Sequence, residues 1–88
     1  MKKYYVVCKG RKLGIFDTWY DCNEQVYCCR NAMYKSFEKL ELAMIYIANN
    51  MPNGEKYVLK INGMDKYFCD YHLFVDALES ILVKGAML

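Results

Sequence analysis

The chain has 88 residues, 56% of them hydrophobic and 16% aromatic, which is enough for one small domain with a modest core and too little for two independent domains. This composition excludes a disordered polar chain, and the first apolar run is too short for a secretion signal or a membrane span. The net charge of +2 is unevenly divided: residues 1–37 carry seven basic against three acidic side chains, a net +4, and residues 38–88 carry five against seven, a net −2. We therefore expect any surface that binds a polyanion to lie in the first part.

Two strands and a helix are predicted at the start of the chain. The run of aromatic and β-branched residues Tyr4–Cys8 indicates a strand, and the glycine-bounded turn at 10–14 returns the chain into a second strand. Thr18 is placed to cap a helix that reaches about residue 29, with Asp21 three residues later in a capping-box arrangement. The inward side of this helix consists of residues at helical spacing: Cys22, Val26 and Cys29.

A short strand at 33–37 and an unusually apolar helix at 40–48 are predicted next. One face of this helix presents Leu40, Ala43, Met44 and Ile47. Its other side is apolar as well, through Leu42, Ile45 and Tyr46. Because a helix that is apolar on two sides needs two neighbours, we expect the C-terminal part of the chain to cover this second side.

A connection rich in Pro, Gly and Asn at 49–55 leads to a second hairpin and a last helix. The hairpin turns at Asn62 and Gly63, the preferred pair for a two-residue turn. Asp70 is placed to cap the last helix, and Gly85 is expected to end it. The apolar stripe of this helix consists of Phe74, Ala77, Leu78, Ile81 and Leu82.

The expected fold class is therefore α+β. A small three-stranded antiparallel sheet with two helices, in the order ββαβα, is extended by a C-terminal ββα unit. Residues 1–48 form the first module, and residues 49–88 form a hairpin-helix extension that packs on the same domain.

No pattern typical of a catalytic or metal site appears in the sequence. The five cysteines are odd in number and include no C-x-x-C pair, so we expect reduced thiols in an intracellular protein, cytoplasmic or nuclear. His72 is the sole histidine and has no cysteine or carboxylate at ligand spacing. Ser-His-Asp and Cys-His spacings and phosphate-cradling glycine motifs are also absent. The expectation is a protein without enzymatic activity, metal or cofactor.

Four short motifs follow one another in residues 3–48: "YYVV", "KGRK-x-G-I-F", "T-W-x-x-C-x-x-Q-V" and "A-x-Y-K-S-F". Together they resemble the N-terminal hybrid-binding domain of eukaryotic-type ribonuclease H, a module that also occurs in the caulimovirus viroplasmin proteins. The resemblance implies a three-stranded antiparallel sheet with two helices on one face. It also implies binding of RNA–DNA hybrids, and more weakly of double-stranded RNA, through the minor groove without sequence specificity. Residues 49–88 are not covered by it.

The resemblance also assigns five contacts with the nucleic acid: Tyr5, Arg11, Trp19, Tyr34 and Lys35. It implies that the aromatic rings pack on DNA sugars, while backbone amides of the first hairpin loop and of the helix start meet RNA 2′-hydroxyls. Lys9 and Lys12 flank Arg11, and such a basic cluster can neutralise several phosphates of a duplex. A buried core position for Trp19 and a solvated turn for the lysines are the alternatives.

Two functions from different classes remain open. The first is a nucleic-acid-binding module whose partners are RNA–DNA hybrid or double-stranded RNA, together with a ribonuclease H catalytic domain or another nucleic-acid enzyme, and no membrane. The second is a protein-interaction or self-association module of viroplasmin type, with its interface on the C-terminal ββα unit. Exposure of Trp19 and Tyr34 favours the first, whereas their burial, together with an apolar patch on residues 57–82, favours the second.

Overall fold

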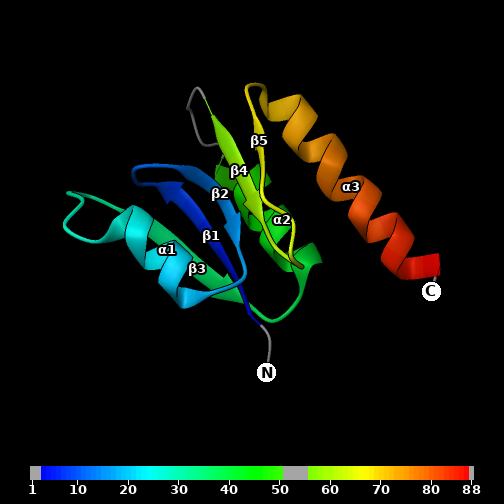
Figure 1. Ribbon diagram of the computed structural model, residues 1–88, viewed down its shortest axis with the longest axis horizontal. Coiled ribbons are helices and arrows are strands. Elements are labelled where there is room, and N and C mark those ends of the chain that lie inside the picture. The colour runs from blue at the N-terminus through cyan, green and yellow to red at the C-terminus, as the bar shows by residue number, and fades with distance from the viewer. Residues whose placement is uncertain (1–2, 51–55, 88) are drawn as a thin grey trace.

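In the computed structural model, which describes residues 3–50 and 56–87, five strands form one sheet and three helices pack against it (Figure 1). The elements are β1 (Tyr4–Lys9), β2 (Leu13–Phe16), α1 (Trp19–Val26), β3 (Met33–Phe37), α2 (Leu40–Asn50), β4 (Tyr57–Lys60), β5 (Lys66–Phe68) and α3 (Tyr71–Met87). The strand order is β3-β1-β2-β4-β5, and every neighbouring pair is antiparallel except β2 and β4, which are parallel. The predicted α+β class is confirmed. None of the helices in these ranges is long and apolar enough to cross a membrane.

The helices lie on both faces of the sheet (Figure 1). Neighbouring residues of a strand point to opposite faces. Val6 of β1 accordingly belongs to the cluster under α2 and α3, whereas Val7 packs with Phe16 and Cys22 under α1. The expectation that the first two helices share one face is therefore wrong. β1 is apolar on both faces, so its sequence does not alternate and does not indicate which face each helix covers.

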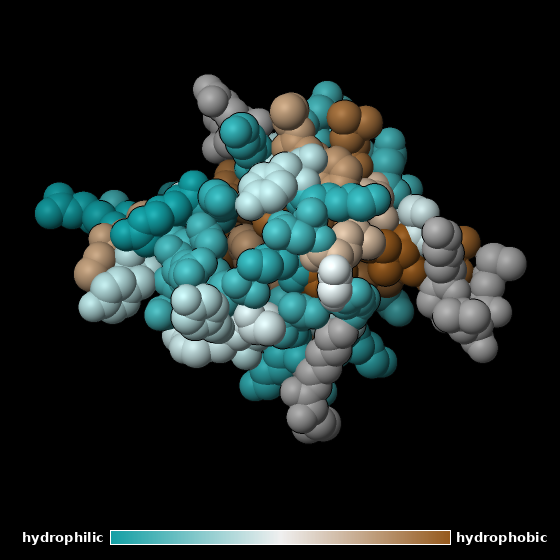
Figure 2. Space-filling model, in the orientation of Figure 1, coloured by the Kyte–Doolittle hydropathy of each residue, from teal (hydrophilic) through white to brown (hydrophobic). Residues whose placement is uncertain are grey.

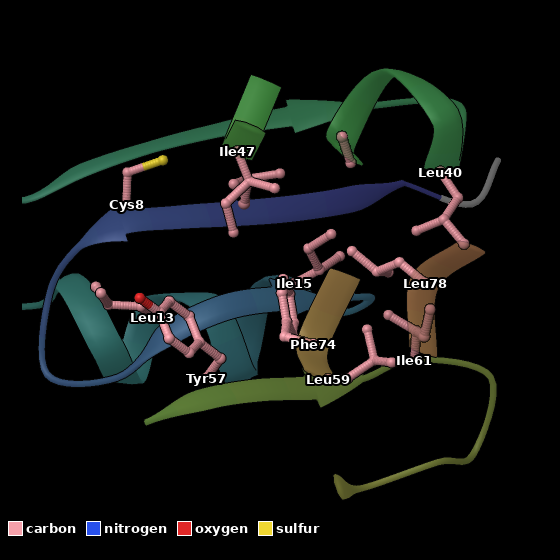
Figure 3. Packing of buried hydrophobic residues seen from close by; sticks show 12 residues of the cluster. Cys8, Leu13, Ile15, Leu40, Ile47, Tyr57, Leu59, Ile61, Phe74 and Leu78 are labelled. Carbon is pink, nitrogen blue, oxygen red and sulfur yellow. The ribbon is translucent and has the colours of Figure 1, made fainter. Parts of the chain in front are cut away.

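The larger core lies between the sheet and the helices α2 and α3. Ile47 of α2 and Phe74 and Leu78 of α3 point towards Ile15 and Leu59 of the strands, and all five side chains are fully buried (Figure 3). Because α3 and β4 supply part of this cluster, the C-terminal elements and the first three strands bury their apolar surface against one another.

The second side of α2 is not covered by the C-terminal elements. Leu42 and Ile45 are 47% and 56% exposed, so the expectation that the C-terminal hairpin and helix would cover them is wrong. Tyr46 is half-buried, with its ring 5.3 Å from that of Phe37. The reason lies in the strand order: β4 joins the sheet beside β2, and α3 consequently packs over β4 and β5 next to α2.

α1 begins as predicted and ends earlier. The Thr18 hydroxyl accepts a hydrogen bond from the Asp21 backbone N–H at 3.2 Å, which is the expected cap. The helix ends at Val26 instead of about residue 29, and Cys28 already has a positive φ of 55°. The backbone N–H of Arg11, in the loop after β1, donates to the Gln25 carbonyl in the last turn, and the helical pattern of the sequence does not indicate this contact. Burial between α1 and the sheet raises the pKa of the Cys22 thiol to about 11, so this side chain packs as a neutral apolar group.

The C-terminal hairpin has the predicted two-residue turn. Asn62 and Gly63 both have positive φ values, 53° and 78°, and the Met64 N–H donates to the Ile61 carbonyl at 2.8 Å. At the start of α3 the Asp70 carboxylate accepts from the His72 N–H at 2.7 Å, again as predicted.

α3 continues through Gly85 to Met87, so the predicted end at Gly85 is wrong. Glycine tolerates a helical backbone at a cost of about 1 kcal/mol, and the residue alone does not stop a helix whose apolar stripe is packed.

Candidate nucleic-acid interface

Three aromatic side chains from separate elements meet on the α1 face of the sheet. Trp19 is the first residue of α1. The centre of its ring lies 6.0 Å from the ring centre of Tyr5 in β1 and 5.7 Å from that of Tyr34 in β3, and both pairs of rings are tilted. Trp19 is 48% exposed and Tyr34 is 44% exposed. We call these three residues the aromatic cluster. Rings that are held by one another and half open to solvent are suited to packing on flat or apolar groups of a ligand.

The strand register explains why these residues meet. Tyr5 pairs with Phe16 of β2, and Val7 pairs with Tyr34 of β3, so Tyr5, Val7 and Tyr34 point to the same face. α1 starts just after β2 ends, at the level of Tyr5, and the Thr18 cap sets its first turn there. The predicted cap and the predicted strands therefore bring Trp19 to the two tyrosines.

Arg11 closes the other end of α1. Its guanidinium Nη1 donates to the carbonyls of Glu24 at 3.0 Å and Tyr27 at 2.7 Å, and its backbone N–H donates to the Gln25 carbonyl at 2.9 Å. These are carbonyls that a helix end leaves without intrahelical partners. Gly10 permits the close approach, because a Cβ at this position would lie 2.6 Å from the Gln25 oxygen. The "KGRK" loop is thus shaped around the end of the helix.

Arg11→Met is therefore expected to lower the free energy of unfolding by about 1 kcal/mol, because hydrogen bonds to the carbonyls at the end of α1 are lost. The measurement is urea unfolding of the two chains, followed by far-UV circular dichroism. Lys9→Met removes the same charge from the exposed end of β1 and serves as the control, with an expected change near zero. Equal stability of the unchanged chain and Arg11→Met would contradict a structural role for the guanidinium.

The two lysines of the first hairpin lie away from the aromatic cluster. The Lys12 ammonium lies beside Tyr67 of β5, 3.4 Å from the hydroxyl and 5.2 Å from the ring centre of that tyrosine. Lys9 is exposed at the end of β1. Both lysines flank Gly10 and Arg11, which contact the C-terminal end of α1, whereas Trp19 is the first residue of this eight-residue helix, about 10 Å of helix rise away.

Lys35 points to the opposite face of the sheet from Tyr34. It pairs with Val6, and its ammonium lies 5.6 Å from the ring centre of Phe37 and 5.7 Å from that of Tyr46, on the α2 side. The structure thus brings together Tyr5, Trp19 and Tyr34 and leaves the predicted cations distributed around them.

Three residues of the second hairpin that the sequence analysis did not connect with this region contact it: Lys60 pairs with Asp21, the Asn62 backbone N–H donates to Asp17, and the Tyr67 hydroxyl lies beside Lys12. Nothing local in the sequence indicates that β4 lies beside β2. Within residues 3–50 and 56–87, no group of three or more His, Cys, Asp or Glu side chains is placed to hold a metal ion.

The surface of the α1 face is largely hydrophilic. Figure 2 shows teal and white residues over α1 and the adjoining strands, and brown residues towards α3. Large exposed apolar side chains outside the aromatic cluster include Leu42 and Ile45 on α2 and Leu73 and Val83 on α3. Trp19 and Tyr34 are exposed, so burial of both rings, one of the two features that would favour the interaction module, is not observed.

The part of the chain that carries the aromatic cluster is similar to known proteins. The family model of the ribonuclease H1 N-terminal domain matches residues 3–47. A ribonuclease H of Crithidia fasciculata is 48% identical over 44 residues, and one of Saccharomyces cerevisiae is 41% identical over 44 residues. Each alignment covers 50% of this chain but 9% and 13%, respectively, of the relatives' own lengths. No solved structure matches the chain. The family match contains the whole aromatic cluster and the basic hairpin, and β4, β5 and α3 lie outside it.

Proposed function

The chain belongs to the ribonuclease H1 N-terminal domain family through residues 3–47, and from this premise we propose that it is a non-catalytic module that binds RNA–DNA hybrid and, more weakly, double-stranded RNA. Binding is through the minor groove and independent of base sequence. The observation that carries the proposal is the half-exposed aromatic cluster at the start of α1, inside the matched segment.

The shape and chemistry of the ligand explain this choice. Duplexes of A-like form have a wide, shallow minor groove that displays 2′-hydroxyls, and proteins recognise them mostly by shape and by contacts to hydroxyls and phosphates. The first N–H groups of a helix have no intrahelical acceptors and carry partial positive charge, so the start of α1 is suited to meet hydroxyl or phosphate oxygens. The rings of Trp19 and Tyr34 pack best on a deoxyribose, where no 2′-hydroxyl intrudes. A duplex with one strand of each kind satisfies both requirements.

The cations supply a component that does not distinguish between duplexes. Lys9 and Lys12 extend the surface past the far end of α1, and Lys35 lies on the other side of the edge strand β3 from Tyr34. A phosphate backbone that follows this edge can meet Tyr34 from one side and Lys35 from the other. With roughly three such contacts, the logarithm of the affinity should fall against the logarithm of the salt concentration with a slope of about −3.

We expect the affinities to follow the order hybrid, double-stranded RNA, double-stranded DNA when all three duplexes have one sequence and one length. The measurement is a fluorescence anisotropy titration of end-labelled duplexes at fixed salt, repeated with a second base sequence. Trp19 is the sole tryptophan, so its intrinsic emission reports in the same titration whether the ligand reaches the aromatic cluster.

Two outcomes of this titration, and one of a cleavage assay with the same hybrid, decide the proposal. Equal affinity for all three duplexes would reduce the site to an unspecific basic surface. Absence of binding at low salt would favour a protein-interaction module, to be sought by light scattering of the free chain. Cleavage of the hybrid in the presence of Mg²⁺ that disappears when one of the chain's own Asp or Glu residues is replaced would contradict the non-catalytic assignment.

The proposed partners follow from the relatives' names and lengths. Both relatives are called ribonuclease H, and the aligned part is a small share of each. We therefore place the module beside a ribonuclease H catalytic domain or another enzyme that acts on nucleic acid, within the cytoplasm or nucleus, where such duplexes form.

A further inference from the structure

The segment that carries Trp19 is tied to the C-terminal hairpin by three polar contacts. The Asp17 N–H donates to the Lys60 carbonyl at 3.1 Å, and the Asn62 N–H donates to the Asp17 carboxylate at 2.8 Å. The Lys60 ammonium lies 3.0 Å from the Asp21 carboxylate. Asp17 and Asp21 flank Trp19 in the chain, so residues outside the family match hold the start of α1 on both sides of the indole.

The parallel pairing of β2 and β4 puts the hairpin in this position. Lys60 pairs with Phe16 and so points to the α1 face, directly beside the first turn of the helix. Gly14 makes the approach of β4 possible, because its φ is +146° and a Cβ there would lie 1.9 Å from the Val58 carbonyl oxygen. The tight turn at Asn62 and Gly63 then places the backbone N–H of Asn62 within hydrogen-bond distance of the Asp17 carboxylate.

The charge of Asp21 matters for an anionic ligand. A carboxylate in the first turn stabilises a helix, but it also repels a phosphate that approaches the same turn. Partial burial pushes the pKa of the Asp21 carboxyl up, but hydrogen bonds from Thr18 and Lys60 and the charge of Lys60 together hold it below its usual value. The hydrogen bond and charge of Asp21 in turn raise the pKa of Lys60. Near neutral pH both groups are charged, and their charges cancel beside the aromatic cluster.

We propose that the C-terminal ββα unit is a positioning element for the nucleic-acid site and that Lys60 is its positioning residue. The ammonium of Lys60 holds the Asp21 carboxylate against the side of the sheet and neutralises it, so that a phosphate backbone can approach the start of α1. This inference rests on the proposed function. It assigns a role in ligand binding to residues 56–68, which the family match does not include.

Lys60→Met keeps most of the aliphatic length and removes the charge, and we expect it to weaken hybrid binding roughly threefold to tenfold at low salt. Lys60→Arg is expected to bind within about twofold of the unchanged chain, since its guanidinium can pair with the same carboxylate. Lys66→Met is the matched control, because it changes the net charge by the same amount on the same hairpin. Lys66 is exposed, but it pairs with Leu59 and therefore faces the α2 and α3 side of the sheet. Its expected effect is less than twofold.

A second variant separates neutralisation of Asp21 from a direct contact of Lys60 with phosphate. Asp21→Asn in the Lys60→Met background removes the unbalanced carboxylate while keeping an oxygen that can accept from the Thr18 hydroxyl. Affinity restored to within about twofold supports the inference. A loss that persists in the double variant, with unchanged thermal unfolding, would overturn it in favour of direct phosphate contact.

The same titrations distinguish failure of the role proposed for Lys60 from failure of the proposed function. Equal affinities of the unchanged chain and Lys60→Met would overturn the inference alone, because the hybrid would still be bound. Absence of hybrid binding by the unchanged chain would overturn the proposed function and this inference with it.

Discussion

Trp19→Ala is expected to weaken hybrid binding by about 1–3 kcal/mol, the range for the loss of one aromatic platform, while the chain stays folded. The indole is half exposed and touches Tyr5 and Tyr34 at the surface, so its removal takes away contact area for a ligand and leaves no internal cavity. Anisotropy titration with labelled hybrid measures the affinity, and far-UV circular dichroism with thermal unfolding verifies the fold.

Tyr20→Ala provides a matched control for this substitution. Tyr20 is the next residue of the same helix and more exposed than Trp19, but it has no place in the aromatic cluster. We expect its replacement to leave the affinity within about twofold. Unfolding of Trp19→Ala would assign the indole to the core, and an equal loss in both variants would show that binding does not depend on the aromatic cluster.

Phe74→Ala is expected to lower the free energy of unfolding by about 3–5 kcal/mol, the usual cost of removing a fully buried phenyl ring. Phe74 is completely buried, with its ring 5.6 Å from Tyr57 and 6.1 Å from Phe68, in the cluster that also contains Val6 and Ile15. Because one cluster joins the C-terminal elements to β1 and β2, the first half of the chain should unfold together with the second. The emission of Trp19, which lies in the first half, measures this directly in urea.

Coincident transitions by Trp19 emission and by far-UV circular dichroism, both shifted to lower urea, are the expected result. Leu73→Ala, on the exposed side of α3, is the control and should shift neither transition appreciably. If the helical signal shifted in Phe74→Ala while the Trp19 transition stayed in place, the C-terminal unit would be a separate folding unit. The positioning role proposed for Lys60 would then lose its structural basis.

The sequence by itself determined the elements whose signals are local. The cap at Thr18, the turn at Asn62 and Gly63 and the cap at Asp70 all depend on a side chain or backbone conformation within a few residues, and the structure has each of them. The aromatic and β-branched strands were predictable for the same reason. The motifs around Trp19 and Tyr34 also identified the segment that the family comparison matches.

The tertiary structure alone decided how these elements share the two faces of the sheet. A strand that is apolar on both sides, such as β1, does not show which side a helix covers, and a parallel pair such as β2 and β4 has no turn that announces it. The cations depend on this arrangement. Lys35 faces away from Tyr34, Arg11 binds the end of α1, and Lys60 reaches Asp21 from 39 residues along the chain. Charge counts locate a basic segment, but contacts between distant residues decide where each charge points.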